Sequence, residues 1–142
     1  MTSEFCVAVH ALVFLNHKGG TVSSEELAQN ICTNPARVRK VMAKLKRAGL
    51  VETKEGADGG YLFEENPAKV SLETVSQALN IAFVSSAWRS GNTEMKCLIA
   101  SGMADIMDTI YRDLDHLCKE HLDKISIRDL DDKIFKDRAN SG

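Results

Sequence analysis

The chain has 142 residues, of which 44% are apolar, and its formal net charge is −2. This length and composition fit one domain, with or without an appended helix, and support a packed core. No apolar stretch approaches the roughly 18 residues that a membrane-spanning helix needs, so we expect a soluble protein.

The first predicted element is a helix over the apolar run from Phe5 to Leu15, ended by Gly19-Gly20. One predicted face consists of Phe5, Val9, Leu12 and Val13. The run has no basic flank and no cleavage site, so we expect a cytoplasmic helix and not a signal peptide. The next residues, Thr21 to Ser23, favour a short strand.

A second, short helix follows. Ser23 and Glu26 have the spacing of a capping box, and Leu27 and Ile31 lie four residues apart on one face. The helix is expected to end at a turn formed by Cys32 and Thr33.

The third predicted helix begins at Asn34 or Pro35, since Asn is a good N-cap and Pro is favoured at the first helical position. Gly49 is placed to end it with positive φ. Its apolar arc contains Val38, Val41, Met42, Leu45 and Ala48. Its Lys and Arg side chains all fall outside that arc.

A glycine-tipped hairpin comes next. Residues 50–53 and 61–63 have strand character, and the intervening EGADGG supplies turn residues. Asp58, Gly59 and Gly60 can bring backbone N–H groups close to phosphate. Two helices joined by a tight turn and followed by a hairpin form a winged helix-turn-helix, whose second helix enters the DNA major groove.

The charge distribution agrees with that interpretation. Residues 35–54 carry seven Lys and Arg against one acid, whereas the rest of the chain is acidic. A local basic surface is typical of phosphate binding. For an isolated amphipathic helix, the alternative is a solvated basic face with no ligand.

The chain changes character after Asn66-Pro67, so we divide it into a DNA-binding domain (residues 1–66) and a helical dimerisation or sensor region (residues 67–142). Ser71 caps a predicted helix, and an irregular segment with Trp88 follows. A long amphipathic helix from about Cys97 to Leu122 would span roughly 37 Å. Its apolar positions are Ile99, Met103, Ile106, Ile110, Leu114, Leu117 and His121 or Leu122.

A stripe this long predicts a homodimer interface, which would present two recognition helices to successive turns of the major groove. The alternative is that the preceding helix and the tail cover the stripe within one chain. The tail, residues 126–142, is expected to form one short helix. The predicted fold is therefore mainly α with a small β-hairpin: a winged helix-turn-helix plus a long C-terminal dimerisation helix.

Three strings carry a family resemblance: TNPARVRKVMAKLKRAGLV, GADGGYL and KISIRDL. With the order of elements, they resemble the Rrf2 family of bacterial winged-helix regulators (BadM-type, related to IscR and NsrR) over essentially the whole chain, and in particular its YwnA-like branch. The resemblance implies a dimeric transcription factor, usually a repressor. It implies that the groove-facing end of the third helix contains Asn34, Pro35, Ala36, Arg37, Arg39 and Lys40, and that Gly56 to Tyr61 form the wing tip.

The cysteines restrict the kind of sensor. Iron–sulfur relatives carry three closely spaced cysteines before the long helix, but this sequence has only Cys97 there, so we expect no cofactor. Cys97 is a candidate redox thiol because a helix start and the adjacent Lys96 would stabilise a thiolate. Cys32 and Cys6 are weaker candidates and are expected to be small buried residues. Cys118 and its neighbouring histidines lack zinc-site spacing, so no metal site is predicted.

The sequence thus predicts a cytoplasmic homodimer that binds a near-palindromic operator in double-stranded DNA. Base or phosphate contacts are expected from Arg37, Arg39 and Lys40, and phosphate contacts from Lys44, Arg47 and Lys54. The wing is expected to contribute Gly56, Asp58, Gly59, Gly60 and Tyr61. No catalytic or nucleotide-binding motif is recognisable, so we do not expect an enzyme. The alternative is a winged-helix protein-interaction module, and the effector, whether protein or small molecule, stays open.

Overall fold

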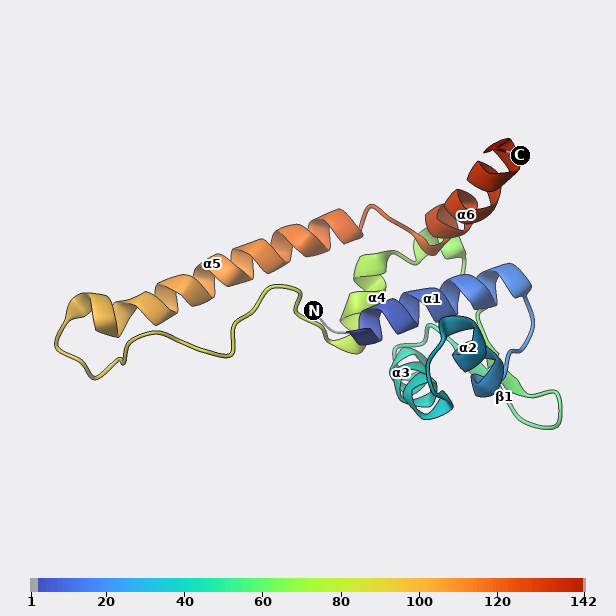
Figure 1. Ribbon diagram of the computed structural model, residues 1–142, viewed down its shortest axis with the longest axis horizontal. Coiled ribbons are helices and arrows are strands. Elements are labelled where there is room, and N and C mark those ends of the chain that lie inside the picture. The colour runs from blue at the N-terminus through green and yellow to red at the C-terminus, as the bar shows by residue number, and fades with distance from the viewer. Residues whose placement is uncertain (1–2, 142) are drawn as a thin grey trace.

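The computed structural model describes residues 3–141, with side chains up to residue 136. Its elements are α1 (Ser3–Lys18), α2 (Ser24–Ile31), α3 (Pro35–Arg47), β1 (Glu52–Lys54), β2 (Gly60–Leu62), a 3-10 turn (Pro67–Lys69), α4 (Leu72–Leu79), α5 (Leu98–Leu122) and α6 (Ile127–Ser141). Figure 1 shows α1 to α4 and α6 gathered at one end, with α5 projecting away from them. The predicted fold class, mainly helical with a small hairpin and a long C-terminal helix, is confirmed.

The helix-turn-helix forms where the capping residues predicted it. The Ser23 hydroxyl accepts a hydrogen bond from the Glu26 amide at 3.1 Å, and Asn34 accepts one from the Arg37 amide at 2.8 Å. Between the helices, Cys32 takes a left-handed conformation with φ of 64°, which makes the turn tight. Gly49 ends α3 with φ of 80°, as predicted. Ala48 differs from the prediction, since it lies at the C-cap and is exposed.

The hairpin pairs β1 with β2 in antiparallel register, with Thr53 opposite Tyr61. The predicted third strand is reduced to one bridge, in which Val22 and Tyr61 exchange backbone hydrogen bonds of 2.9 and 2.8 Å. Gly60 explains why the strands approach so closely there. A Cβ at this position would lie 2.5 Å from the Val22 carbonyl oxygen, and its φ is +153°.

The buried face of α1 differs from the predicted one. Its core-facing side chains are Val7, Ala8, Ala11, Leu12 and Leu15. Of the predicted face only Leu12 is fully buried, whereas Phe5, Val9 and Val13 are half-buried. The reason is that α1 is apolar on two sides, and the second side faces α6.

The start of α6 is fixed to α4 by backbone hydrogen bonds. The Leu72 amide donates to the Ile125 carbonyl at 2.8 Å, and the Ile127 amide donates to the Val70 carbonyl at 2.9 Å. Ile127 is fully buried in the same core as α1 and α3. The predicted short tail helix is thus longer than expected, because α6 has 15 residues and a fixed first turn.

The predicted long helix is confirmed as α5, with 25 residues and Cys97 at its N-cap. Loop 80–97 runs back along this helix. The buried Asp115 carboxylate accepts the amides of residues 83 and 84 at 2.5 and 3.0 Å, and Arg89 pairs with Asp105 and Asp108 at 2.6 and 2.8 Å. The loop therefore covers one side of α5 and leaves another side open.

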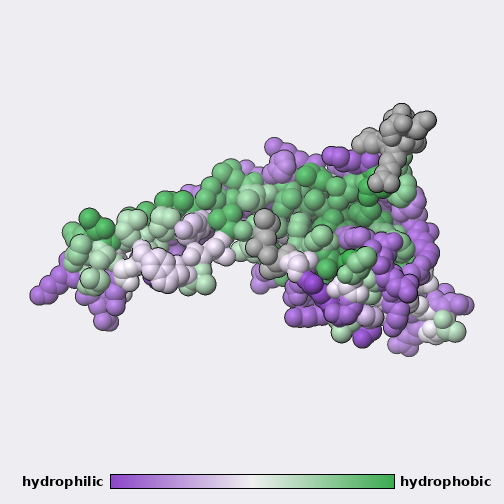
Figure 2. Space-filling view, in the orientation of Figure 1, coloured by the Kyte–Doolittle hydropathy of each residue, from purple (hydrophilic) through white to green (hydrophobic). Residues whose placement is uncertain are grey.

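That open side carries the apolar stripe, which we define as Ile99, Met103, Ile106, Ile110, Leu114 and Leu117. All six side chains are exposed. Figure 2 shows apolar surface running along α5 and onto the end of the molecule that holds α1 and α6. The alternative in which α4 and the tail cover this stripe within one chain is therefore wrong for the residues that the structure describes.

Candidate nucleic-acid interface

The exposed face of α3 combines short and basic side chains. Its inward arc consists of Val38, Val41, Met42 and Leu45, all fully buried. At about 100° per residue, the positions opposite that arc are Ala36, Lys40, Ala43 and Arg47. The two alanines allow a close approach of the helix axis to a surface, while the two cations flank them. This geometry suits an α-helix in a major groove, whose width just admits one.

The N-terminal turn of α1 lies against one flank of this face. The Arg37 guanidinium donates to the Ser3 hydroxyl. Lys44 Nζ lies 2.9 Å from Glu4 Oε2, and Lys40 Nζ lies 3.7 Å from Glu4 Oε1. The hydrogen bond from Lys44 lowers the pKa of Glu4 by more than burial raises it, so this carboxylate is held in its charged form.

The other flank of α3 meets the start of α2 and the base of the wing. Arg39 Nη1 lies 3.3 Å from the Ser24 hydroxyl and 3.7 Å from Glu25 Oε1. Burial raises the pKa of the Tyr61 hydroxyl, against an opposing effect of the Arg39 charge. The guanidinium of Arg39 therefore sits between α2 and the wing.

The wing tip is exposed and rich in glycine. Gly56 has φ of +109°, and a Cβ on Gly59 would clash with the Lys54 carbonyl oxygen. The Thr21 hydroxyl donates to the Asp58 carbonyl at 2.7 Å, which ties the tip to the segment before α2. Lys54 itself is exposed on β1. The tip is thus a fixed turn and not a free loop.

The predicted site residues form three groups along the chain. The first is the helix start, Asn34 to Lys40; the second is the later part of α3, with Lys44 and Arg47; and the third is the wing, from Lys54 to Tyr61. Sequence reasoning missed Ser3, Glu4, Ser24 and Glu25. Glu4 lies 40 residues from Lys44 along the chain, and no local pattern connects two such positions.

The four cysteines lie on three helices: Cys6 on α1, Cys32 at the end of α2, and Cys97 and Cys118 on α5. Cys6 and Cys32 are exposed, so the expectation that they are small buried residues is wrong. Cys6 points to the second side of α1, and Cys32 caps α2 on the surface. Cys97 is exposed, and its position beside the backbone of Ala100 and Ile99 at the start of α5 lowers the pKa of its thiol. The predicted helix-start effect is therefore present, whereas Lys96 is not among its causes.

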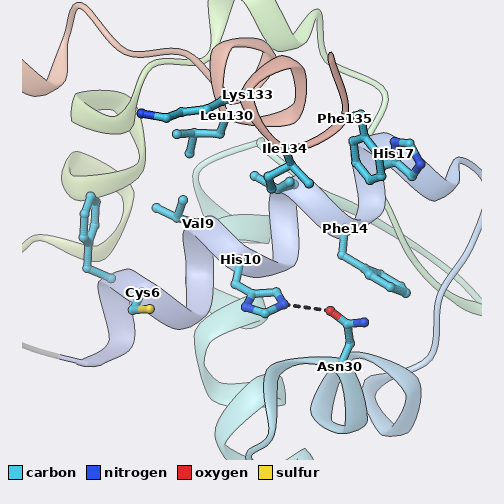
Figure 3. A pocket seen from close by; sticks show the side chains of 12 residues that line it. Cys6, Val9, His10, Phe14, His17, Asn30, Leu130, Lys133, Ile134 and Phe135 are labelled. Carbon is cyan, nitrogen blue, oxygen red and sulfur yellow. Dashed lines mark hydrogen bonds between the residues drawn. The ribbon is translucent and has the colours of Figure 1, made fainter. Parts of the chain in front are cut away.

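A groove lies between α1 and α6, which we call the α1–α6 groove (Figure 3). Its volume is about 700 Å³. The walls are mainly apolar, with Phe5, Val9, Val13, Phe14, Leu130 and Ile134. At its edges, His10 Nε2 and Asn30 Oδ1 lie 2.7 Å apart, and the rings of His17 and Phe135 stack with centroids 3.5 Å apart. The half-buried second side of α1 thus lines an open apolar surface.

The comparisons with known proteins agree with this architecture. The family model described as Rrf2, iron-dependent transcriptional regulator, matches residues 1–133. The chain is 27% identical over 135 residues to YwnA of Bacillus subtilis, named as an HTH-type transcriptional regulator, with 95% of this chain and 99% of YwnA covered. The structure resembles that of a transcriptional regulator from Lactobacillus plantarum, with a TM-score of 0.83, 22% identity and 100% of both chains covered. The structure also resembles T. potens IscR, with a TM-score of 0.66 and 20% identity, and the match covers 92% of this chain and 84% of that chain.

Iron in the family description raises the question of whether these residues fit an iron centre. Cys97 and Cys118 are 21 residues apart on α5, about 30 Å along the helix axis. Within the side chains that the structure describes, no three His, Cys, Asp or Glu are grouped so that they could hold a metal ion. The donor set therefore does not fit an iron–sulfur cluster, which needs several thiolates together.

In residues 3–141, no helix is long and apolar enough to cross a membrane.

Proposed function

Because the chain belongs to the Rrf2 family of transcriptional regulators, we propose that it acts in the cytoplasm as a homodimeric repressor that binds a near-palindromic operator. The observation that carries this proposal is the basic outward face of α3, which is fixed between α1, α2 and the wing. Such a face fits a major groove, and two copies related by a two-fold axis fit two half-sites.

Within one copy, the first turns of α3 would contact bases. Ala36 and Lys40 lie in the outward arc, with Arg37 and Arg39 on its two flanks. Arg is suited to bidentate contact with guanine. Phosphate contacts would come from Arg47 and Lys54, and from the backbone of the wing tip at Gly56, Asp58, Gly59 and Gly60. Asn34, Pro35 and Tyr61 would set the position of these elements.

The dimer would form through the apolar stripe of α5. Six exposed apolar side chains along a 25-residue helix are costly in water unless another surface covers them. The α1–α6 groove is a second exposed apolar surface of the same chain. A second copy offers both surfaces, so reciprocal packing of stripe and groove would bury them together in an isologous interface.

The experiment is a fluorescence-anisotropy titration of the full chain with duplex selected from the source genome and with random duplex, at low and moderate salt. We expect tighter binding to the selected duplex and weaker binding of both as salt rises. Lys40→Ala should lower the affinity for both duplexes. Its matched control is Lys136→Ala, which removes the same charge from α6 and should leave binding unchanged.

The alternative is a winged-helix module whose basic face binds an acidic protein. Absence of DNA binding by the wild-type chain at low salt would favour that module and reject the regulator. Equal effects of Lys40→Ala and Lys136→Ala would reject α3 as the contact surface while leaving DNA binding itself in place.

One observation favours thiol-based control of this binding. The exposed Cys97 thiol lies at the start of α5, where the backbone of Ala100 and Ile99 lowers its pKa and so favours the thiolate, the form that peroxide oxidises. Peroxide should then add mass at Cys97 and lower DNA affinity in the wild type, but not in Cys97→Ser. Loss of affinity in both proteins would reject Cys97 as the switch.

A further inference from the structure

Glu4, in the first turn of α1, is an acidic side chain that lies against the basic side chains of the recognition helix α3. Its two carboxylate oxygens are shared between two lysines of α3: Oε2 lies 2.9 Å from Lys44 Nζ, and Oε1 lies 3.7 Å from Lys40 Nζ. Residues 40 and 44 are about one helical turn apart. One carboxylate from α1 therefore contacts two successive turns of α3.

This pairing is better shielded than a typical surface ion pair. The side chains of Glu4 and Lys44 are only 23% and 29% exposed. The hydrogen bond with Lys44 is also the main cause that holds the pKa of Glu4 below its ordinary value. By contrast, the side chains of Arg39 and Glu25 are 53% and 70% exposed, and Arg39 Nη1 lies 3.7 Å from Glu25 Oε1. Solvent and salt screen such an exposed pair, so it contributes little.

A partly buried acid among DNA-facing cations has a consequence for selectivity. With Glu4 charged, the group formed with Lys40 and Lys44 has one positive charge in place of two. A phosphate that approaches Lys44 meets the carboxylate as well, whatever the DNA sequence. Specificity is a difference between two affinities, so it rises when the weakened phosphate contact is one that random DNA would use and that the operator complex, fixed in register by base contacts, would not.

We propose that Glu4 is a specificity-determining residue, which holds Lys44 away from phosphates and so lowers the affinity for random DNA more than for the operator. The proposal rests on the proposed function, since it requires α3 to face DNA. Glu4 acts through Lys44 and is a positioning residue, not a DNA contact.

The test replaces the carboxylate by its neutral isostere in Glu4→Gln. Each phosphate contact adds about 0.9 to the slope of log affinity against log salt, so one freed lysine should raise affinity for random duplex roughly fivefold to tenfold at about 0.1 M salt. The affinity for the selected duplex should rise less, so the ratio of the affinity for selected duplex to that for random duplex should fall. Glu94→Gln, on the exposed loop beside α5, removes the same charge far from α3 and should change neither value by more than about twofold.

The lysine partner supplies a second variant that keeps Glu4. Lys44→Gln alone should change affinity for random duplex by less than about twofold, because Lys44 is already engaged. In the double variant with Glu4→Gln, the gain in affinity and in salt slope should disappear. A merely structural role of Glu4 would not make its effect depend on Lys44 in this way.

The outcomes separate this proposal from the proposed function. Failure of the wild-type chain to bind any duplex rejects the proposed function. If the wild type binds DNA but Glu4→Gln matches Glu94→Gln in affinity and salt slope, the role of Glu4 is rejected and the regulator stands. A tenfold loss of random-duplex affinity in Lys44→Gln also rejects it, because Lys44 would then already be a full phosphate contact.

Discussion

Truncation of Ile110 in the middle of the apolar stripe should weaken the proposed dimer. This side chain is 44% exposed in the single chain. Full burial of an Ile side chain contributes about 2 kcal/mol, so covering the exposed part contributes about 0.9 kcal/mol per copy and about 2 kcal/mol for a two-fold interface. Since 1.4 kcal/mol corresponds to a factor of ten, Ile110→Ala should raise the dimer dissociation constant roughly 20-fold to 30-fold.

Sedimentation equilibrium over a range of protein concentrations measures this constant directly. Thr109→Ala is the matched control, because it changes the neighbouring exposed residue of the same helix on a different side. It should leave the constant within about twofold of the wild-type value, given that surface substitutions rarely exceed 0.5 kcal/mol. The reasoning is refuted if Ile110→Ala dissociates no more readily than the wild type, or if Thr109→Ala weakens the dimer equally.

The other predictions concern the helix-turn-helix cap, the loop that follows α4 and the reactive thiol. Asn34→Ala removes the side chain that accepts the first α3 amide, so it should cost about 1 kcal/mol and lower the calorimetric melting temperature by about 3 °C. Asp115→Ala releases the amides of residues 83 and 84 and should lower the fluorescence anisotropy of Trp88, the only tryptophan; an unchanged anisotropy would show that Arg89 alone holds the loop. Burial raises the pKa of Asp115, but the hydrogen bonds that its carboxylate accepts lower this pKa by more, so it stays below the ordinary 3.8. The charged carboxylate therefore stabilises the fold above pH 3.8, and this stabilisation is lost as the pH falls through the pKa of Asp115 in the folded protein. Alkylation of Cys97, followed by peptide mass spectrometry, should have its midpoint at lower pH than a cysteine in an unstructured peptide, and an equal midpoint would contradict the effect of the backbone at the start of α5 on the thiol pKa.

The elements that could best be predicted from the sequence are the helices whose ends are marked by capping residues. Ser23, Asn34 and Ser71 each cap a helix through the amide three residues later, as their positions suggested. A cap involves neighbours in sequence only, so the pattern contains all the information that the contact needs. The length of α5 was predictable for a similar reason, because its stripe repeats over many turns.

The orientation of α1 could not be predicted in the same way. Its sequence is apolar on two sides, and periodicity alone does not distinguish the core-facing side from the other. The choice depends on contacts with α3, α4 and α6, which come from distant parts of the chain. The exposure of Cys6 has the same origin, because this residue lies on the side that lines the α1–α6 groove.

The two sides of α1 connect the two surfaces that the proposed function requires. A helix that is apolar on two sides is expected to be covered on both, and within one chain the core covers only the side of Val7 and Leu12. The other side, with Phe5 and Val9, lines the groove that a second copy would fill. Between them, the first turn of α1 reaches α3 through Glu4. Because a helix is rigid over its length, α1 would connect the proposed dimer surface directly to the cations of the recognition helix.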